Sequence, residues 1–167
     1  MTKIALLCAT AIGALSLAGV AAAAPAQTNL GGQVAPICEI TNLNNVLNFP
    51  SLTSGASVSD NAVSVRCNDA DGAIVSLTSS EGHLESDDVE DSGIGYSAVF
   101  TRIPVIGLNL TLNANSGTND ITAFDAVNGG ATLAAGVNDA NLTVTLNGTA
   151  VFAGGYSDTL SADIIAQ

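Results

Sequence analysis

Basic and aromatic side chains are scarce in this sequence of 167 residues. It has three Lys and Arg against fifteen Asp and Glu, and it contains no tryptophan, two tyrosines and four phenylalanines. Binding to nucleic acid requires clustered Lys and Arg, so this function is excluded, and binding to an anionic membrane surface is disfavoured. Lysine occurs only at Lys3, which excludes a lysine–asparagine isopeptide crosslink in the remainder of the chain. With so few aromatics, the core must be built from Val, Leu, Ile and Ala.

A single histidine, His83, leaves few catalytic arrangements. It lies in the polar segment 80–85 between two predicted strands, and we interpret it as a solvated loop residue. A Ser-His-Asp triad requires only that its members be close in space, but the sequence has no nucleophile-elbow motif. We therefore expect no enzymatic activity and no cofactor.

The first 26 residues have the three-part pattern of a cleaved secretory signal. Lys3 gives a positive start, residues 4–20 are apolar, and residues 21–24 are all small or apolar. The apolar run is short for a membrane-spanning helix. Cleavage after Ala26 fits the small-x-small rule, whereas cleavage after Ala24 would leave Pro25 beside the scissile bond. We expect an exported protein in which two arginines stand against fifteen carboxylates, a formal charge of −13 that favours solubility.

Two cysteines remain after the predicted signal, Cys38 and Cys67. An even pair in an exported protein predicts a disulfide, and the separation is unlike a C-x-x-C motif. Cys38 opens one predicted strand and Cys67 ends another, so the bond would join two strands. Closing a loop of this size should stabilise the fold by about 3–4 kcal/mol.

The apolar residues after the signal recur with period two, and turn-rich segments separate them, which predicts a single all-β domain, a sandwich or barrel. The predicted strands are 32–41, 46–49, 62–67, 73–78, 95–102, 108–113, 142–152 and 156–165. We expect the last two to form a hairpin about the turn at 153–155. The segment 123–137 is rich in small residues and fits a helical turn or an irregular loop.

The segment before Cys38 alternates as an extended chain. One face of this segment carries Thr28, Leu30, Gly32 and Val34, and the other carries Asn29, Gly31 and Gln33. An exposed, alternating N-terminal strand is a candidate for addition to the sheet edge of another subunit. A disordered leader and an ordinary first strand are the alternatives, and periodicity alone does not separate them.

The acidic segment 85–91 contains four weak candidates for calcium ligands, Asp87, Asp88, Glu90 and Asp91. Calcium favours several oxygen ligands, but the order of ligands here does not match the twelve-residue calcium loop. We therefore favour a solvated loop and predict no metal site, with weak calcium binding as the minority interpretation.

The order of parts resembles a known family. Cys38 opens a strand, Leu-Asn-Phe-Pro follows at 47–50, a strand ends at Cys67, and the chain closes on Gly-x-Tyr-x-Asp-x-Leu at 154–160 with alternation to residue 165. The segments 63–67, 95–100 and 154–165 match best. Together they resemble the spore coat protein U domain family, which includes subunits of archaic chaperone–usher pili.

The resemblance implies an incomplete, immunoglobulin-like antiparallel β-sandwich over residues 37–167 that is completed by donor-strand exchange. Residues 27–36, here called the N-terminal extension, would supply the donor strand to a neighbouring copy of the same or a related subunit. A periplasmic chaperone and an outer-membrane usher would handle the subunit, which passes through the periplasm to a surface fimbrium without inserting into a membrane. The implied function is structural and supports adhesion or biofilm formation.

A second hypothesis is a self-contained, secreted β-sandwich that binds a surface ligand, either as an adhesive module or as a calcium-binding one. The segment 28–34 discriminates between the two hypotheses. If it folds into its own sandwich, the binding module is favoured, and if it pairs with another chain, the pilus subunit is favoured.

Overall fold

The computed structural model of the chain describes residues 26–88 and 92–167. The predicted signal peptide lies outside the described residues except for Ala26, and Glu90 and Asp91 also lie outside them. The chain divides into two compact units, residues 1–33 and 34–167. None of the helices in the described residues is long and apolar enough to span a membrane.

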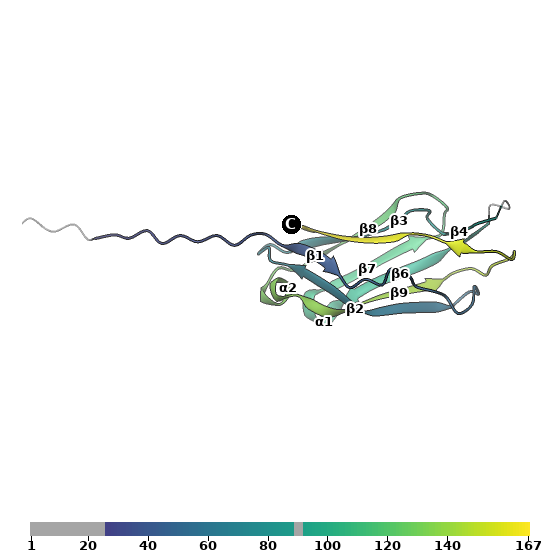
Figure 1. The fold of residues 1–167 in the computed structure, drawn as a ribbon, viewed down its shortest axis with the longest axis horizontal. Coiled ribbons are helices and arrows are strands. Elements are labelled where there is room, and N and C mark those ends of the chain that lie inside the picture. The colour runs from purple at the N-terminus through teal and green to yellow at the C-terminus, as the bar shows by residue number, and fades with distance from the viewer. Residues whose placement is uncertain (1–25, 89–91) are drawn as a thin grey trace, which may run out of the picture. The chain divides into compact units, whose positions relative to one another are not determined.

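Residues 34–167 form a mostly β unit built from antiparallel sheets, as the sequence predicts (Figure 1). The largest sheet has five strands in the order β1-β2-β9-β6-β7 and curls into a half-barrel. Its strands are β1 (Cys38–Thr41), β2 (Ser57–Cys67), β9 (Val137–Leu146), β6 (Tyr96–Arg102) and β7 (Leu108–Ala114). The other two sheets have the orders β11-β3-β8 and β10-β4-β5. Their strands are β11 (Leu160–Ala166), β3 (Ala73–Ser79), β8 (Ile121–Val127), β10 (Tyr156–Ser157), β4 (Leu84–Ser86) and β5 (Gly93–Ile94).

Two short helices, α1 (Ile103–Ile106) and α2 (Ala131–Ala135), lie at the end of the unit where β1 begins, and β4 lies at the opposite end (Figure 1). Pro104 occupies the first turn of α1, where its missing N–H costs no hydrogen bond. Each helix is followed by a glycine with positive φ, Gly107 and Gly136, a backbone conformation that glycine adopts without steric cost.

The core is aliphatic and follows the period-two pattern. Alternate residues of β3, from Ala73 to Leu77, are fully buried, and so are alternate residues of β6 from Tyr96 to Phe100. The strands of the curled sheet and those of the β11-β3-β8 sheet contribute to one continuous cluster of buried side chains. Tyr96 and Phe100 are the two aromatic residues among its buried side chains.

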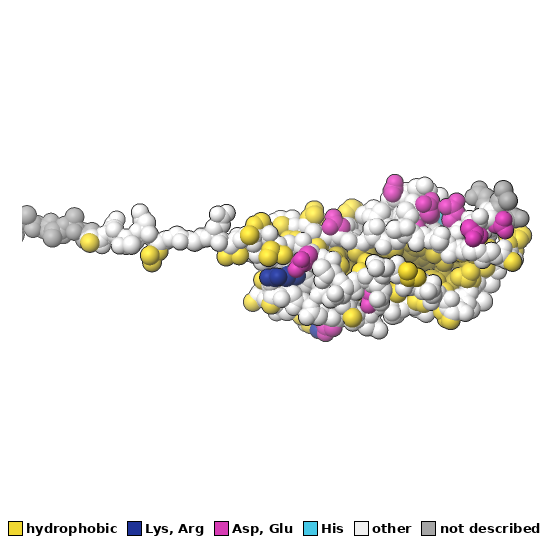
Figure 2. All heavy atoms as spheres, viewed as in Figure 1, with side chains coloured by type: hydrophobic (Ala, Val, Ile, Leu, Met, Phe, Trp, Pro, Cys, Tyr) yellow, Lys and Arg dark blue, Asp and Glu magenta, His cyan; other side chains and the backbone are white. Residues whose placement is uncertain are grey.

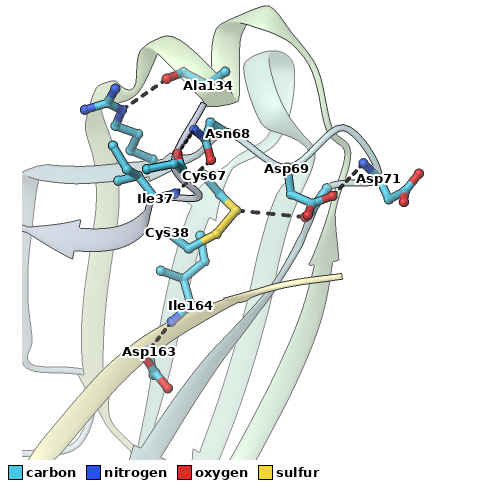
Figure 3. Close-up of a disulfide and its surroundings, with 12 residues drawn as sticks. Ile37, Cys38, Cys67, Asn68, Asp69, Asp71, Ala134, Asp163 and Ile164 are labelled. Atoms are coloured by element: carbon cyan, nitrogen blue, oxygen red, sulfur yellow. Dashed lines mark hydrogen bonds between the residues drawn. A yellow bond between two sulfur atoms is a disulfide. The ribbon is translucent and has the colours of Figure 1, made fainter. Parts of the chain in front are cut away.

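The predicted disulfide between Cys38 and Cys67 is present and joins strands β1 and β2 (Figure 3). The two cysteines lie directly opposite each other in the antiparallel ladder, and Cys67 is fully buried. The bond lies beside Ile164 of β11, a buried member of the same core (Figure 3). The disulfide therefore stabilises the region where the curled sheet meets the last strand.

The predicted hairpin between 142–152 and 156–165 is wrong. Strand β9 ends at Leu146, and its two edges are occupied by β2 and β6. The last strand has no edge of β9 available, and β11 instead pairs with β3. The turn-forming dipeptide Asn147-Gly148 ends β9, and the two-residue strand β10 pairs with β4.

Three other predicted segments differ from the structure. Residues 46–49 form no strand, and of the segment 32–41 only Cys38–Thr41 is a strand, because neither region has a partner edge along its remaining length. The segment 123–137 contributes α2, the helical turn that its composition fits, but its first residues belong to β8. Alternation of apolar residues is thus a sound predictor of strands only where a second strand is available for pairing.

Candidate functional site: an apolar groove beside the last strand

The last strand, β11, has one open edge. Thr159 O accepts a hydrogen bond from Ser80 N, and Gln167 N donates one to Gly72 O, so odd-numbered residues face β3 in this regular antiparallel ladder. The backbone N–H and C=O groups of the even-numbered residues 160–166 therefore point away from β3. Within the described residues, no strand is hydrogen-bonded to β11 on that side.

An apolar groove lies beside the start of β11. Hydrophobic side chains are exposed in a band along the length of the unit (Figure 2). The groove is lined by Leu43, Asn44, Asn45, Leu47, Phe49, Val58, Leu84, Tyr96, Leu142, Val144, Asp158 and Leu160. Its cavity volume of about 120 Å³ is several times what one enclosed water requires. The lining is mostly apolar, so the groove is suited to receive apolar side chains.

The irregular segment 42–50 contributes five of the residues that line the groove. Leu43, Leu47 and Phe49 of this segment are half-buried against the core. The segment is attached to β2 through Asp60, whose carboxylate accepts hydrogen bonds from Asn44 N at 2.8 Å and from Ala62 N at 3.2 Å. Asp60 is only 3% exposed, and these bonds satisfy a buried charge that would otherwise be costly.

Among the described residues that line the groove, Asp158 is the one with a charged side chain. Its carboxylate accepts hydrogen bonds from Ser79 Oγ, Ser80 Oγ, Glu81 N and Tyr96 Oη, at 2.5, 2.8, 3.0 and 2.7 Å. Burial raises the pKa of Asp158, but these hydrogen bonds, that of Ser79 first, outweigh it and lower the pKa of the carboxyl below its usual value. Burial raises the pKa of the Tyr96 phenol, which therefore remains a donor at physiological pH. Asp158 thus joins the start of β11 to the β3–β4 connection and to β6.

We expect Asp158→Ala to destabilise the fold by about 1–3 kcal/mol, because it leaves the Tyr96 hydroxyl and two serine hydroxyls without their acceptor. The lowered pKa of Asp158 also determines the direction in which the stability of the fold changes with pH. A carboxyl with a depressed folded-state pKa contributes stability above its unfolded value of about 3.9, and this contribution is lost as the pH falls through the folded pKa.

Urea unfolding of the wild type and of Asp158→Ala at neutral pH tests the first statement, and urea unfolding of the wild type and of Asp158→Asn between neutral pH and pH 2 tests the second. The wild type should lose more stability on acidification than Asp158→Asn does. Asp71→Asn, in the exposed turn between β2 and β3, is the control and should follow the wild type. Equal acid sensitivity of wild type and Asp158→Asn would contradict this role for Asp158.

The four residues predicted to enter a neighbouring groove, Thr28, Leu30, Gly32 and Val34, are in neither helix nor strand. Leu30 is 93% exposed and Val34 is 82% exposed. Asn68, which follows β2, fixes the point where the N-terminal extension joins the sheet. Its side chain accepts a hydrogen bond from Ile37 N and donates one to Ala35 O, each 2.8 Å long.

The acidic segment has a structural contact at Asp87. The Asp87 carboxylate accepts a hydrogen bond from Gly155 N, and Asp87 N donates one to Gly155 O. Among the described residues, which include Asp87 and Asp88, no group of three or more His, Cys, Asp or Glu side chains is placed to hold a metal ion. The calcium candidates Glu90 and Asp91 lie outside the described residues.

His83 lies in the loop before β4, as predicted, but it is packed more closely than a fully solvated residue. His83 is half-buried, and its ring lies between the backbones of Gly93 and Gly117. A Cβ atom at Gly93 would lie 2.0 Å from the ring, and one at Gly117 would lie 2.6 Å from it. The ring occupies the space that these two glycines leave open.

From the sequence, a donor strand was proposed, but the groove-lining residues were not identified as a group. Leu43, Leu142 and Leu160 come from three distant segments, and nothing local to each marks it as part of a groove. Among the groove-lining residues, Asp158 and Leu160 belong to a motif that was singled out in the sequence, Gly-x-Tyr-x-Asp-x-Leu at 154–160. Comparisons of the chain with protein-family models, with curated proteins and with solved structures found no match.

Proposed function

We propose that the protein is a structural subunit of a surface pilus, an incomplete immunoglobulin-like sandwich assembled by donor-strand exchange. The observation that carries the proposal is the apolar groove beside the open edge of β11. An unpaired edge next to exposed apolar surface favours aggregation unless a partner covers it. A strand inserted there would satisfy the backbone groups of β11 and bury the groove lining at the same time.

The N-terminal extension of a second copy has the chemistry of such a strand. It carries no charged residue, so it enters an apolar groove without burying a charge. Leu30 and Val34 lie two positions either side of Gly32 on one face of an extended chain, and both are exposed. Exchange repeated from subunit to subunit is a heterologous contact that does not close, and its product is a fibre.

Before exchange, the groove needs a temporary partner during transit. A periplasmic chaperone that offers an extended strand would protect it, and an outer-membrane usher would bring the next subunit to it. The assembled fibre at the cell surface would support adhesion or biofilm formation. The antiparallel orientation of the donor is favoured, because antiparallel pairing is slightly more stable per residue and every ladder of the described residues is antiparallel.

A fluorescent peptide with the sequence of residues 27–36 tests the proposal. We expect it to bind the protein beginning at Gln27, at nanomolar protein concentration, where fibre growth is negligible. Leu160→Asp should weaken peptide binding by at least about tenfold, because the bound peptide would bury the negative charge of the new aspartate without a partner. Fluorescence anisotropy measures the binding, and urea unfolding shows whether Leu160→Asp remains folded.

The matched control is Phe124→Ser, which removes an exposed side chain on the outer face of β8. This variant should bind the peptide as the wild type does. A wild-type protein that stays monomeric at high concentration and does not bind the peptide would refute the pilus proposal, and the self-contained binding module would then be the better hypothesis.

A further inference from the structure

The backbone N–H groups along the open edge of β11 are not all equally free to pair with another strand. The even-numbered residues direct their backbone N–H groups away from β3, and these are the groups that a donor strand would engage. Ala162 N and Ile164 N are the two interior donors of this edge. Ile164 N already has an acceptor, because it donates a hydrogen bond to Oδ1 of Asp163 at 2.8 Å.

Asp163 lies on the exposed outer face of β11, whereas Ile164 is 5% exposed and belongs to the core. The side chain therefore reaches around the strand edge to the N–H of the following residue. In this position the carboxylate occupies the hydrogen-bonding site of the next strand. A charged side chain on an edge strand is also a common means of preventing unintended pairing between sheets.

We propose that Asp163 is a guard residue for the open edge, which caps Ile164 N until a donor strand displaces it. The proposal rests on the proposed function, since it describes how strand addition at the same edge is controlled. Two consequences follow. The Ile164 amide is protected from solvent in the isolated subunit, and strand addition must first break the bond between Asp163 and Ile164.

Three variants separate the effect of the hydrogen bond that caps Ile164 N from the effect of the negative charge of Asp163. Asp163→Ala removes both the acceptor and the charge, whereas Asp163→Asn removes the charge but keeps a side-chain oxygen that accepts from Ile164 N. Ser161→Ala changes a side chain on the same exposed face of the same strand and is the matched control. None of these residues lines the groove.

The first measurement is amide hydrogen exchange in the isolated subunit, which does not depend on assembly. We expect the Ile164 amide to exchange faster in Asp163→Ala than in the wild type, with Asp163→Asn and Ser161→Ala close to the wild type. Unchanged exchange at Ile164 in Asp163→Ala would refute the cap, and so would equal acceleration in Asp163→Asn.

The second measurement is the association rate of the peptide of residues 27–36, followed by stopped-flow fluorescence. Loss of one competing hydrogen bond should raise the rate roughly three- to tenfold in Asp163→Ala, and Asp163→Asn should keep the wild-type rate. A rate that is unchanged or lower in Asp163→Ala would overturn the guard role. If the peptide binds none of the proteins, the proposed function fails, and hydrogen exchange still decides whether Asp163 caps the edge.

Discussion

Replacement of Leu30 or Val34 by aspartate should abolish fibre growth and leave the fold of the subunit intact. Burial of a Leu or Val side chain contributes about 1.5–3 kcal/mol, and these are the two largest apolar residues on the donor face of the N-terminal extension. An aspartate at either position would carry an unpaired charge into the groove of the next subunit. Since the native side chains are 93% and 82% exposed, their loss removes little packing within the subunit itself.

Electron microscopy and light scattering of purified protein measure fibre growth, and urea unfolding measures the stability of the subunit. Asn29→Ser and Gln33→Ser, on the opposite face, are matched controls and should assemble normally. A bulky residue at Gly32 should slow assembly by steric clash with the groove. Aspartate variants that assemble while Asn29→Ser does not would show that the wrong face has been assigned.

Removal of the disulfide should lower the free energy of unfolding by about 3–4 kcal/mol, within the range found for native disulfides. The bond closes a loop between residues 29 positions apart, so its loss increases the conformational freedom of the unfolded chain. It also frees β1, a strand of four residues that, among the strands the structure describes, is hydrogen-bonded only to β2. For a chain of this length, the melting temperature should fall by roughly 10 °C.

The informative variant is Cys38→Ala combined with Cys67→Ala, because a serine at position 67 would place a hydroxyl in a fully buried site. Urea unfolding of this variant should match that of the reduced wild type. Because β1 lies beside β11, we also expect reduction to lower the affinity for the peptide of residues 27–36. A change in unfolding free energy below about 1 kcal/mol would mean that neither loop closure nor attachment of β1 limits stability.

The candidate site separates into a part that was visible in the sequence and a part that was not. The alternation of Leu30, Gly32 and Val34 is local, so the proposed donor strand rests on neighbouring residues alone. The groove is formed by residues from at least four separate segments, and Leu160 lies more than a hundred positions from Leu43. Asp60 is indistinguishable in sequence from a solvated acidic residue, and the motif at 154–160 gave no indication of the partners of Asp158, because most of the hydrogen bonds to both carboxylates come from distant backbone and hydroxyl groups.

The sequence by itself determined the mostly β fold, the aliphatic composition of the core and the Cys38–Cys67 bond, because periodicity, composition and an even cysteine pair are properties of the chain alone. Only the tertiary structure decided which strands pair. An alternating run predicts which side chains share a face, but it carries no information on which edge the backbone will meet. For this reason the hairpin predicted for the last two strands was wrong. Strand β9 is placed between β2 and β6, and the last strand is left with β3 on one side and an open edge on the other.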